Sequence, residues 1–151
     1  FFCLRLGRPP RSPLCPYPAL FRSDEARVSL KVGPVSDVLV HMDDDRVVQA
    51  LANLVDNALR FTPEGGMITL SGEALDEGTV SLSVSDTGVG LAQDALDNLF
   101  SLFWQAEGDR KGRAGLGLTI VKGVIEAYGG VVRVESDPGI GATSHMVLYR
   151  A

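Results

Sequence analysis

The sequence lacks a long uninterrupted apolar run, has little cysteine or histidine, and carries no excess of basic residues. Because no stretch of about 18 apolar residues occurs, we predict no membrane-spanning helix. Arg and Pro interrupt the apolar residues near the start, which argues against a signal peptide. The formal net charge of −5 argues against a nucleic-acid surface, which normally needs a basic patch. The 45% of hydrophobic residues are typical of one globular domain with its own core.

The first 23 residues differ from the rest in composition. They hold four arginines and no acid, five of the eight prolines, and both cysteines, Cys3 and Cys15. They show no helical or strand periodicity, and nothing else indicates the oxidising compartment that a disulfide needs. Residues 1–23 resemble the peptide obtained by translating sequencing-adapter DNA. We therefore expect an artefactual or disordered segment, with a polyproline recognition segment as the alternative, and a domain at 24–151.

The remaining sequence alternates between strand-like and helix-like stretches. We predict strands at 27–32, 38–42, 67–74, 79–85, 131–135 and 143–149. We predict helices from the acidic N-cap candidates at 43–45 to residue 59 or 60, early in 91–114 before a polar loop, and at 116–128 before a Gly-Gly C-cap. This order predicts an α+β fold: a two-layer α/β sandwich whose mixed, mostly antiparallel sheet has helices on one face.

The first long helix carries a polar stripe. At about 100° per residue, one face holds Gln49, Asn53, Asp56, Asn57 and Arg60. Asn is a poor helix former, but its carbonyl oxygen suits a Mg²⁺ ion that keeps waters and phosphate oxygens as ligands. An arginine one turn further along could pair with phosphate. The alternative is an ordinary solvated helix face.

Two glycine-containing strings follow. Asp86 comes at a predicted strand end, with Gly88 and Gly90 directly after it. Such an Asp can accept a hydrogen bond from an exocyclic amine such as that of adenine, although an ordinary Asp-Gly turn is the alternative. Residues 112–118 lead into a helix whose exposed N-terminal amides suit phosphate, with a flexible hinge as the alternative. The string is neither a Walker loop nor a dinucleotide fingerprint.

The strings at 53–62, 86–90, 99–104, 112–118 and 139–143 match, in order, an asparagine box, a glycine box, a phenylalanine box and two further glycine boxes. In this respect the chain resembles the catalytic ATP-binding domain of sensor histidine kinases. These belong to a superfamily that also includes gyrase, the Hsp90 chaperones and the MutL repair proteins. The resemblance implies a Bergerat-type ATP-binding fold, ATP and Mg²⁺ as cofactors, and a mobile lid at 91–114.

The resemblance also implies roles for individual residues. Asn57, with help from Asn53, would hold Mg²⁺, and Arg60 would face the phosphates; these three are the expected catalytic residues. Asp86 would bind the adenine amine, with Thr143 nearby through water. The remaining nucleotide contacts are expected from Gly88, Gly90, Arg113, Gly115, Leu116 and Gly117.

The kind of reaction is indicated by Asn53. It stands where the superfamily's ATPases and serine kinases carry a general-base Glu, and an amide cannot accept a proton at neutral pH. This favours phosphoryl transfer to a nucleophile that needs no base, such as imidazole. We do not expect His41 or His145 to be the phosphoacceptor.

We therefore expect the phosphotransfer domain of a two-component sensor kinase. Its phosphoacceptor histidine would lie on a missing or separate dimerisation domain, and a response regulator would act downstream. A non-catalytic regulatory nucleotide-binding module is the alternative, and an ATPase a further one. The isolated domain is expected to be a cytoplasmic monomer without nucleic-acid or direct membrane contact, although its parent protein could be membrane-anchored.

Overall fold

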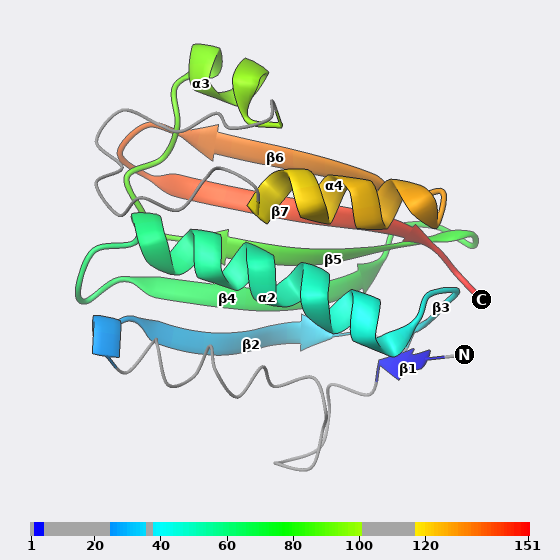
Figure 1. The fold of residues 1–151 in the computed structure, drawn as a ribbon. Coiled ribbons are helices and arrows are strands. Elements are labelled where there is room, and N and C mark those ends of the chain that lie inside the picture. The colour runs from blue at the N-terminus through cyan, green and yellow to red at the C-terminus, as the bar shows by residue number, and fades with distance from the viewer. Residues whose placement is uncertain (1, 5–24, 36–37, 101–116) are drawn as a thin grey trace.

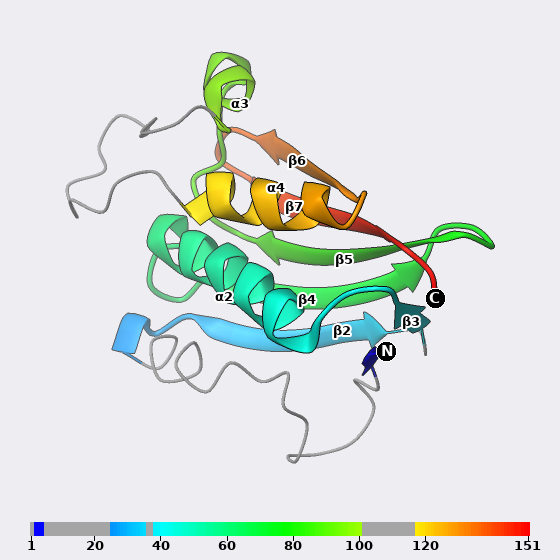
Figure 2. The same ribbon diagram turned by 45° about the vertical axis from the view of Figure 1, so that its right-hand side comes forward.

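The computed structural model describes residues 2–4, 25–35, 38–100 and 117–151. One layer is a five-stranded sheet, and the other is formed by helices α2 (Asp44–Phe61) and α4 (Gly117–Ala127) on one face of that sheet (Figures 1 and 2). This confirms the predicted two-layer α+β fold. Within the described residues, no helix is long and apolar enough to span a membrane.

The sheet has the strand order β2-β4-β5-β7-β6. Its first pair, β2 with β4, is parallel, and the other three pairs are antiparallel. The predicted strands are therefore confirmed, with some shifts at their ends. The strands are β2 (Ser29–Val35), β4 (Met67–Ala74), β5 (Thr79–Asp86), β6 (Val131–Asp137) and β7 (Gly141–Tyr149).

Helix α2 has sequence signals at both ends. Its N-cap is Asp43, whose carboxylate accepts a hydrogen bond from the Asp45 amide at 3.0 Å. It ends at Thr62, where both the backbone N–H and the hydroxyl donate to the Ala58 carbonyl, at 3.0 and 2.7 Å. Pro63, which has no N–H to donate, follows directly. The apolar side of the helix buries Val47, Ala50, Leu51, Leu54, Val55 and Ala58.

Helix α4 packs beside α2 and closes as predicted. Gly129 adopts a φ of +76°, and Gly130 donates its N–H to the Ile125 carbonyl at 3.0 Å. This is the bond pattern of a glycine C-cap, which satisfies carbonyls that the helix end leaves open. Towards the sheet α4 buries Leu118, Val121 and Ile125.

Strand alternation separates a core face from an outer face. The core face of β5 and β7 buries Val80, Leu82, Val84, Met146 and Leu148 under the helices. The outer face carries hydroxyl pairs that bridge neighbouring strands. In one of them the hydroxyls of Ser71 and Ser83 lie 2.7 Å apart, and in another those of Ser85 and Thr143 lie 2.9 Å apart.

The smaller elements lie at the margins. Strand β1 (Phe2–Leu4) pairs antiparallel with β3 (Val38–Val40), and α3 (Gln93–Asn98) follows the Asp86 loop. The sequence predicts no regular structure near the start. Strand β1 was missed because three residues are too few to show periodicity. Residues 5–24 lie outside the described residues, so the proposed origin of 1–23 stays a prediction.

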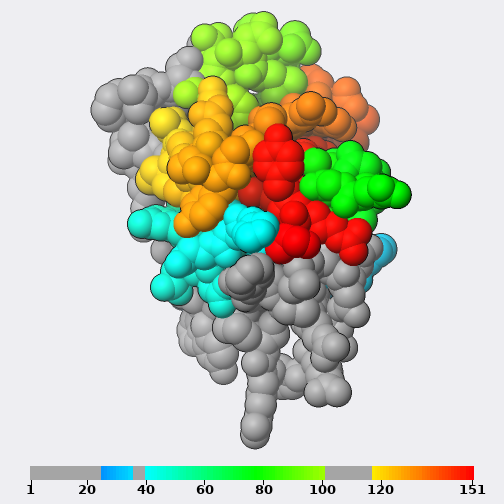
Figure 3. Space-filling view, turned by 90° about the vertical axis from the view of Figure 1, so that its right-hand side faces the viewer, coloured from blue at the N-terminus to red at the C-terminus, as the bar shows by residue number. Residues whose placement is uncertain are grey.

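At the end of the sheet remote from Asp86, the β4–β5 hairpin, the end of α4 and the end of β7 come together (Figure 3). Here Thr79 pairs with Tyr149, and Val40 forms an isolated bridge with Arg150. Large apolar side chains are exposed on Leu75, Tyr128, Val131 and Tyr149. The last strand, β7, therefore ends at this end of the sheet.

Packing of α4 on the sheet can be tested with two isoleucines of the same helix. Ile125 is 0% exposed and Ile120 is 40% exposed. We expect Ile125→Ala to lower the free energy of unfolding by about 2–5 kcal/mol, because it leaves a cavity. Ile120→Ala should cost less than about 1 kcal/mol. Urea unfolding of both variants measures the difference, and equal losses would contradict the described packing.

Candidate functional site

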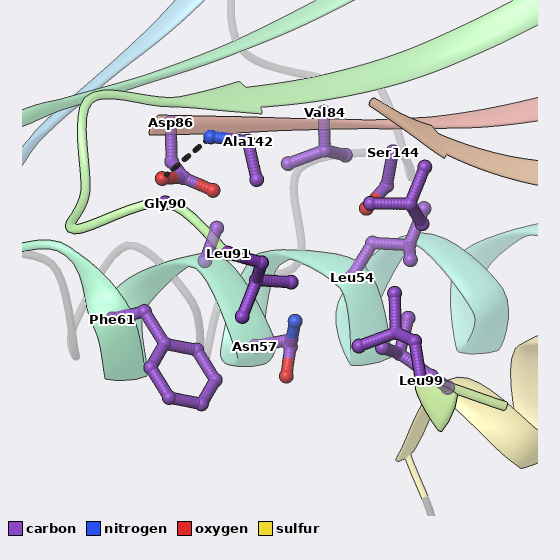
Figure 4. A pocket seen from close by; sticks show the side chains of 13 residues that line it. Leu54, Asn57, Phe61, Val84, Asp86, Gly90, Leu91, Leu99, Ala142 and Ser144 are labelled. Carbon is purple, nitrogen blue, oxygen red and sulfur yellow. Dashed lines mark hydrogen bonds between the residues drawn. The ribbon is translucent and has the colours of Figure 1, made fainter. Parts of the chain in front are cut away.

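A pocket opens between the helix layer and the core face of the sheet (Figure 4). It encloses about 430 Å³, counting its open mouth. Most of its walls are apolar, and its polar side chains are those of Asn57, Asp86 and Ser144. The apolar lining consists of Leu54, Ala58, Phe61, Val84, Leu91, Leu99, Leu118, Val134 and Ala142, and Gly90 completes it. A mostly apolar cavity with a few polar groups is typical of a site for an organic ligand.

Asp86 lies at the last position of β5 and is half-buried. Its Oδ1 accepts hydrogen bonds from the Gly88 amide at 2.8 Å and the Ala142 amide at 3.3 Å. Burial raises the pKa of this carboxyl, and the two amide bonds only partly oppose that rise. Among the described residues nothing hydrogen-bonds Oδ2, so it can accept a hydrogen bond from a ligand.

Two glycines let the backbone approach this carboxyl. A Cβ at Gly88 would lie 2.6 Å from both Asp86 Oδ1 and the Phe61 carbonyl oxygen. Gly141 has a φ of +137°, and a Cβ there would collide with the Asp86 carbonyl oxygen. Neither position can therefore carry a side chain without displacing Asp86. The last glycine box contains Gly141, but the sequence did not indicate this role.

A small network holds the Asp86 loop against the β6–β7 turn. The Gly139 amide donates to the Val89 carbonyl at 2.7 Å. The hydroxyl of Ser136 accepts from the Leu91 amide and donates to the Gly141 carbonyl, both at 2.8 Å. Ser136 was not among the predicted site residues, and a serine before a turn carries no sequence signal for such a role.

The two asparagines of α2 lie one helical turn apart. Asn57 lines the pocket, and no described group hydrogen-bonds its side chain. The Asn53 Nδ2 donates to the Gln49 carbonyl at 3.0 Å. Its Oδ1 lies 3.8 Å from where a Cβ of Gly117 would stand, so Asn53 faces the start of α4. The structure thus places Asn57 in the pocket and Asn53 beside Gly117, and their roles stay predictions.

Of the other predicted residues in the described part, Gly90 lines the pocket and Gly88 supports Asp86. Arg60 does not line the pocket; its guanidinium carbon lies 5.9 Å from the centroid of the Phe61 ring. Arg113, Gly115 and Leu116 lie outside the described residues, as does most of the predicted lid, so their roles stay predictions.

Thr143, which is predicted to lie near the adenine, does not line the pocket. Thr143 pairs with Ser85 across β7 and β5, and the two hydroxyls bond at 2.9 Å on the outer face of the sheet. Because successive side chains of a strand point to opposite faces, its neighbours Ala142 and Ser144 line the pocket instead. The motif gave the position of the glycine box but not which of these residues faces inward.

The titratable groups around the pocket are few. Asp86 is the only acidic residue that lines it in the described part. Neither histidine lines it: His41 is exposed after β3, and the His145 Nδ1 lies 3.4 Å from the Ser81 hydroxyl on the outer face. The expectation that neither is a phosphoacceptor stays a prediction.

The described residues contain no cluster of three or more His, Cys, Asp or Glu side chains that would hold a bare metal ion. The donors present are the neutral amides of Asn53 and Asn57. Such oxygens fit a Mg²⁺ ion that takes its remaining ligands from water and phosphate. Any magnesium here is therefore expected to arrive with a phosphorylated ligand.

Residues 42–150 match the family model described as histidine kinase-, DNA gyrase B- and HSP90-like ATPase. The chain is 46% identical over 118 residues to the sensor protein DivL of Caulobacter vibrioides, an alignment that covers 77% of this chain and 15% of DivL. It is 35% identical over 119 residues to the sensor histidine kinase WalK of Bacillus subtilis, covering 76% of this chain and 20% of WalK. Against the first curated relatives it spans between 15% and 31% of their length.

The fold is also similar to solved structures. The mycobacterial sensor histidine kinase MprB superimposes with a TM-score of 0.78 and 30% identity, covering 89% of this chain and 92% of that one.

The half-buried carboxyl of Asp86 predicts a pH-dependent stability. Because its folded pKa is raised, the folded state favours the protonated form, and ionisation above that pKa costs stability. Asp86→Asn removes this charge and keeps an oxygen for the two amides. We expect the variant to be at least as stable as the wild type at pH 7. The difference should shrink as the pH falls to about 4, the ordinary pKa of Asp.

Urea unfolding at both pH values measures this. The control is Asp44→Asn in the exposed first turn of α2, which should lose up to about 1 kcal/mol because an acid there favours the helix N-terminus. A clear loss of stability in Asp86→Asn at pH 7 would contradict a raised pKa of Asp86 in the folded state.

Proposed function

The chain belongs to the histidine kinase-, DNA gyrase B- and HSP90-like ATPase family, and we propose that it binds Mg-ATP and transfers the γ-phosphoryl group to a histidine of another domain. The observation that carries this proposal is the half-buried Asp86 in a mostly apolar pocket, with Asn57 on the facing helix. A related structure, full-length ShkA, was solved in complex with AMPPNP. It superimposes with a TM-score of 0.77 and 36% identity, covering 91% of this chain and 29% of ShkA.

Adenine would bind between the apolar walls. Asp86 Oδ2 would accept the hydrogen bond from the exocyclic amine, while the Gly88 and Ala142 amides keep the carboxylate in place. Leu54 and Leu118 belong to these walls and would exclude water from the ring faces. A ligand with a carbonyl in place of the amine would meet the carboxylate with a second acceptor, which disfavours guanine.

The phosphates would lie near the start of α4, where Asn53 and Gly117 meet. Helix N-terminal amides attract phosphate, and Arg60 stands one turn beyond Asn57 on α2. Magnesium, when bound, would neutralise part of the charge of the phosphates. Asn57 and Asn53 would orient that ion through their neutral oxygens.

Transfer to imidazole needs no strong base in this domain. A ring nitrogen of the acceptor attacks the γ-phosphorus, a P–N bond forms, and the P–O bond to ADP breaks as ADP leaves. Asn53 stands where a base for water would be, and among the described residues the only acid in the pocket is Asp86. Hydrolysis should therefore be slow, which separates a kinase from an ATPase.

The acceptor would come from a dimerisation domain elsewhere in a longer parent protein or on a separate polypeptide. The relatives are several times longer than this chain, and neither of its histidines lines the pocket. The next partner would be a response regulator that takes the phosphoryl group from that histidine. Because ATP is cytoplasmic, we place the domain in the cytoplasm.

Nucleotide binding can be measured by titrating ADP calorimetrically into the full chain, with and without Mg²⁺. We expect binding that Mg²⁺ strengthens and that Asp86→Asn abolishes. Asn57→Ala should weaken Mg-ADP binding by about 10- to 100-fold, since a bond to a charged group contributes roughly 1.5–3 kcal/mol.

The matched controls are Asp44→Asn and Gln49→Ala, both exposed on α2, and both should bind like the wild type. Mg²⁺ titrated alone should give no heat of binding. A folded wild-type chain that does not bind ADP would refute the site.

Phosphoryl transfer requires a second experiment. The chain is mixed with labelled ATP and the separately purified, histidine-containing dimerisation domain of a related sensor kinase. We expect acid-labile label on that histidine, and none with Asn57→Ala.

Two other results would redirect the proposal. ADP binding without label on any related acceptor would favour a regulatory nucleotide-binding module. Steady phosphate release that disappears in Asn57→Ala would instead identify an ATPase.

A further inference from the structure

We infer that Ser144, rather than Thr143, donates the side-chain hydrogen bond that the pocket offers to a purine ring nitrogen. This assignment rests on the proposed adenine nucleotide site and names a residue that determines its specificity. It follows from which side chains of β7 face the pocket.

Ser144 stands on the core face of β7, opposite Val84 of β5. Figure 4 shows its side chain directed into the cavity near Val84 and Leu54. Among the described residues no group hydrogen-bonds this hydroxyl. A hydroxyl in an apolar wall is costly unless a ligand or water satisfies it, so a donor placed here favours a polar ligand atom.

The neighbouring positions cannot supply this donor. Ala142 faces the pocket but has no hydroxyl, and its amide is already bonded to Asp86. The Thr143 hydroxyl bonds Ser85 on the opposite face. Of these three consecutive residues of β7, only Ser144 brings a hydroxyl into the pocket.

The spacing to Asp86 suits the edge of adenine. Asp86 accepts at one point of the wall, and Ser144 donates two residues beyond Ala142 on the neighbouring strand. Such diagonal positions lie about 7–8 Å apart at their Cα atoms, within reach of two short polar side chains and one purine edge. Adenine carries its exocyclic amine beside ring nitrogens that accept hydrogen bonds, which matches an acceptor followed by a donor.

Calorimetric titration of Mg-ADP into variants of this chain tests the assignment. We expect Ser144→Ala to weaken binding by about 2- to 10-fold, the loss of one neutral hydrogen bond. Ser144→Thr should keep most of the affinity because it keeps the hydroxyl. Thr143→Ala, the matched control, should bind within about 2-fold of the wild type. Thermal unfolding of each variant shows that it is folded.

Ligands that lack one ring nitrogen identify the partner atom. The two analogues are 1-deaza-ADP and 7-deaza-ADP. The analogue that lacks the nitrogen bonded by Ser144 should bind the wild type and Ser144→Ala with equal affinity. The other analogue should still bind the wild type more tightly than Ser144→Ala. Wild-type affinity for ADP in Ser144→Ala, or a larger loss in Thr143→Ala, would overturn the assignment and leave the nucleotide site standing. If ADP fails to bind the folded wild type, the proposed function and this assignment both fall.

Discussion

The half-buried carboxyl of Asp86 is the constraint on which the site depends. A carboxylate can remain ionised in such a place only if hydrogen bonds offset part of its lost hydration. The Gly88 and Ala142 amides supply these bonds, and each can reach Asp86 only because a glycine lies where a side chain would collide. The carboxyl of Asp86 thus joins the end of β5 to the loop after it and to the start of β7, although its negative charge disfavours folding.

Most of the fold could be predicted because apolar and polar residues alternate along its helices and strands with the period of each element. The ends of α2 and α4 carry an Asp N-cap and a Gly-Gly C-cap, and 67–74 alternates cleanly. A mixed sheet was predicted, but not that β2 is its parallel strand, because chain order does not specify which strands become neighbours. Strand β1 could not be predicted either, because Phe2–Leu4 is too short to show a period.

The candidate site was predicted only in part for a similar reason. Asn57 and Asp86 follow from residue type and element, and both line the pocket. Thr143 was predicted from its place in a glycine box, but strand parity decides which face a side chain occupies, and a shift of one residue reverses it. Gly141 and Ser136 act through close backbone approach and a bridging hydroxyl, which become visible only when distant segments are brought together.

The two described ends of the chain lie far from the pocket. The last strand ends beside Thr79, at the end of β5 opposite Asp86, and Val40, which pairs with β1, bridges Arg150 (Figure 1). The described chain ends and the pocket therefore lie at opposite ends of the sheet. A fusion partner, surface anchor or fluorescent label attached at the end near Arg150 would leave the pocket mouth unobstructed, so attachment there requires no change to the residues that line the pocket.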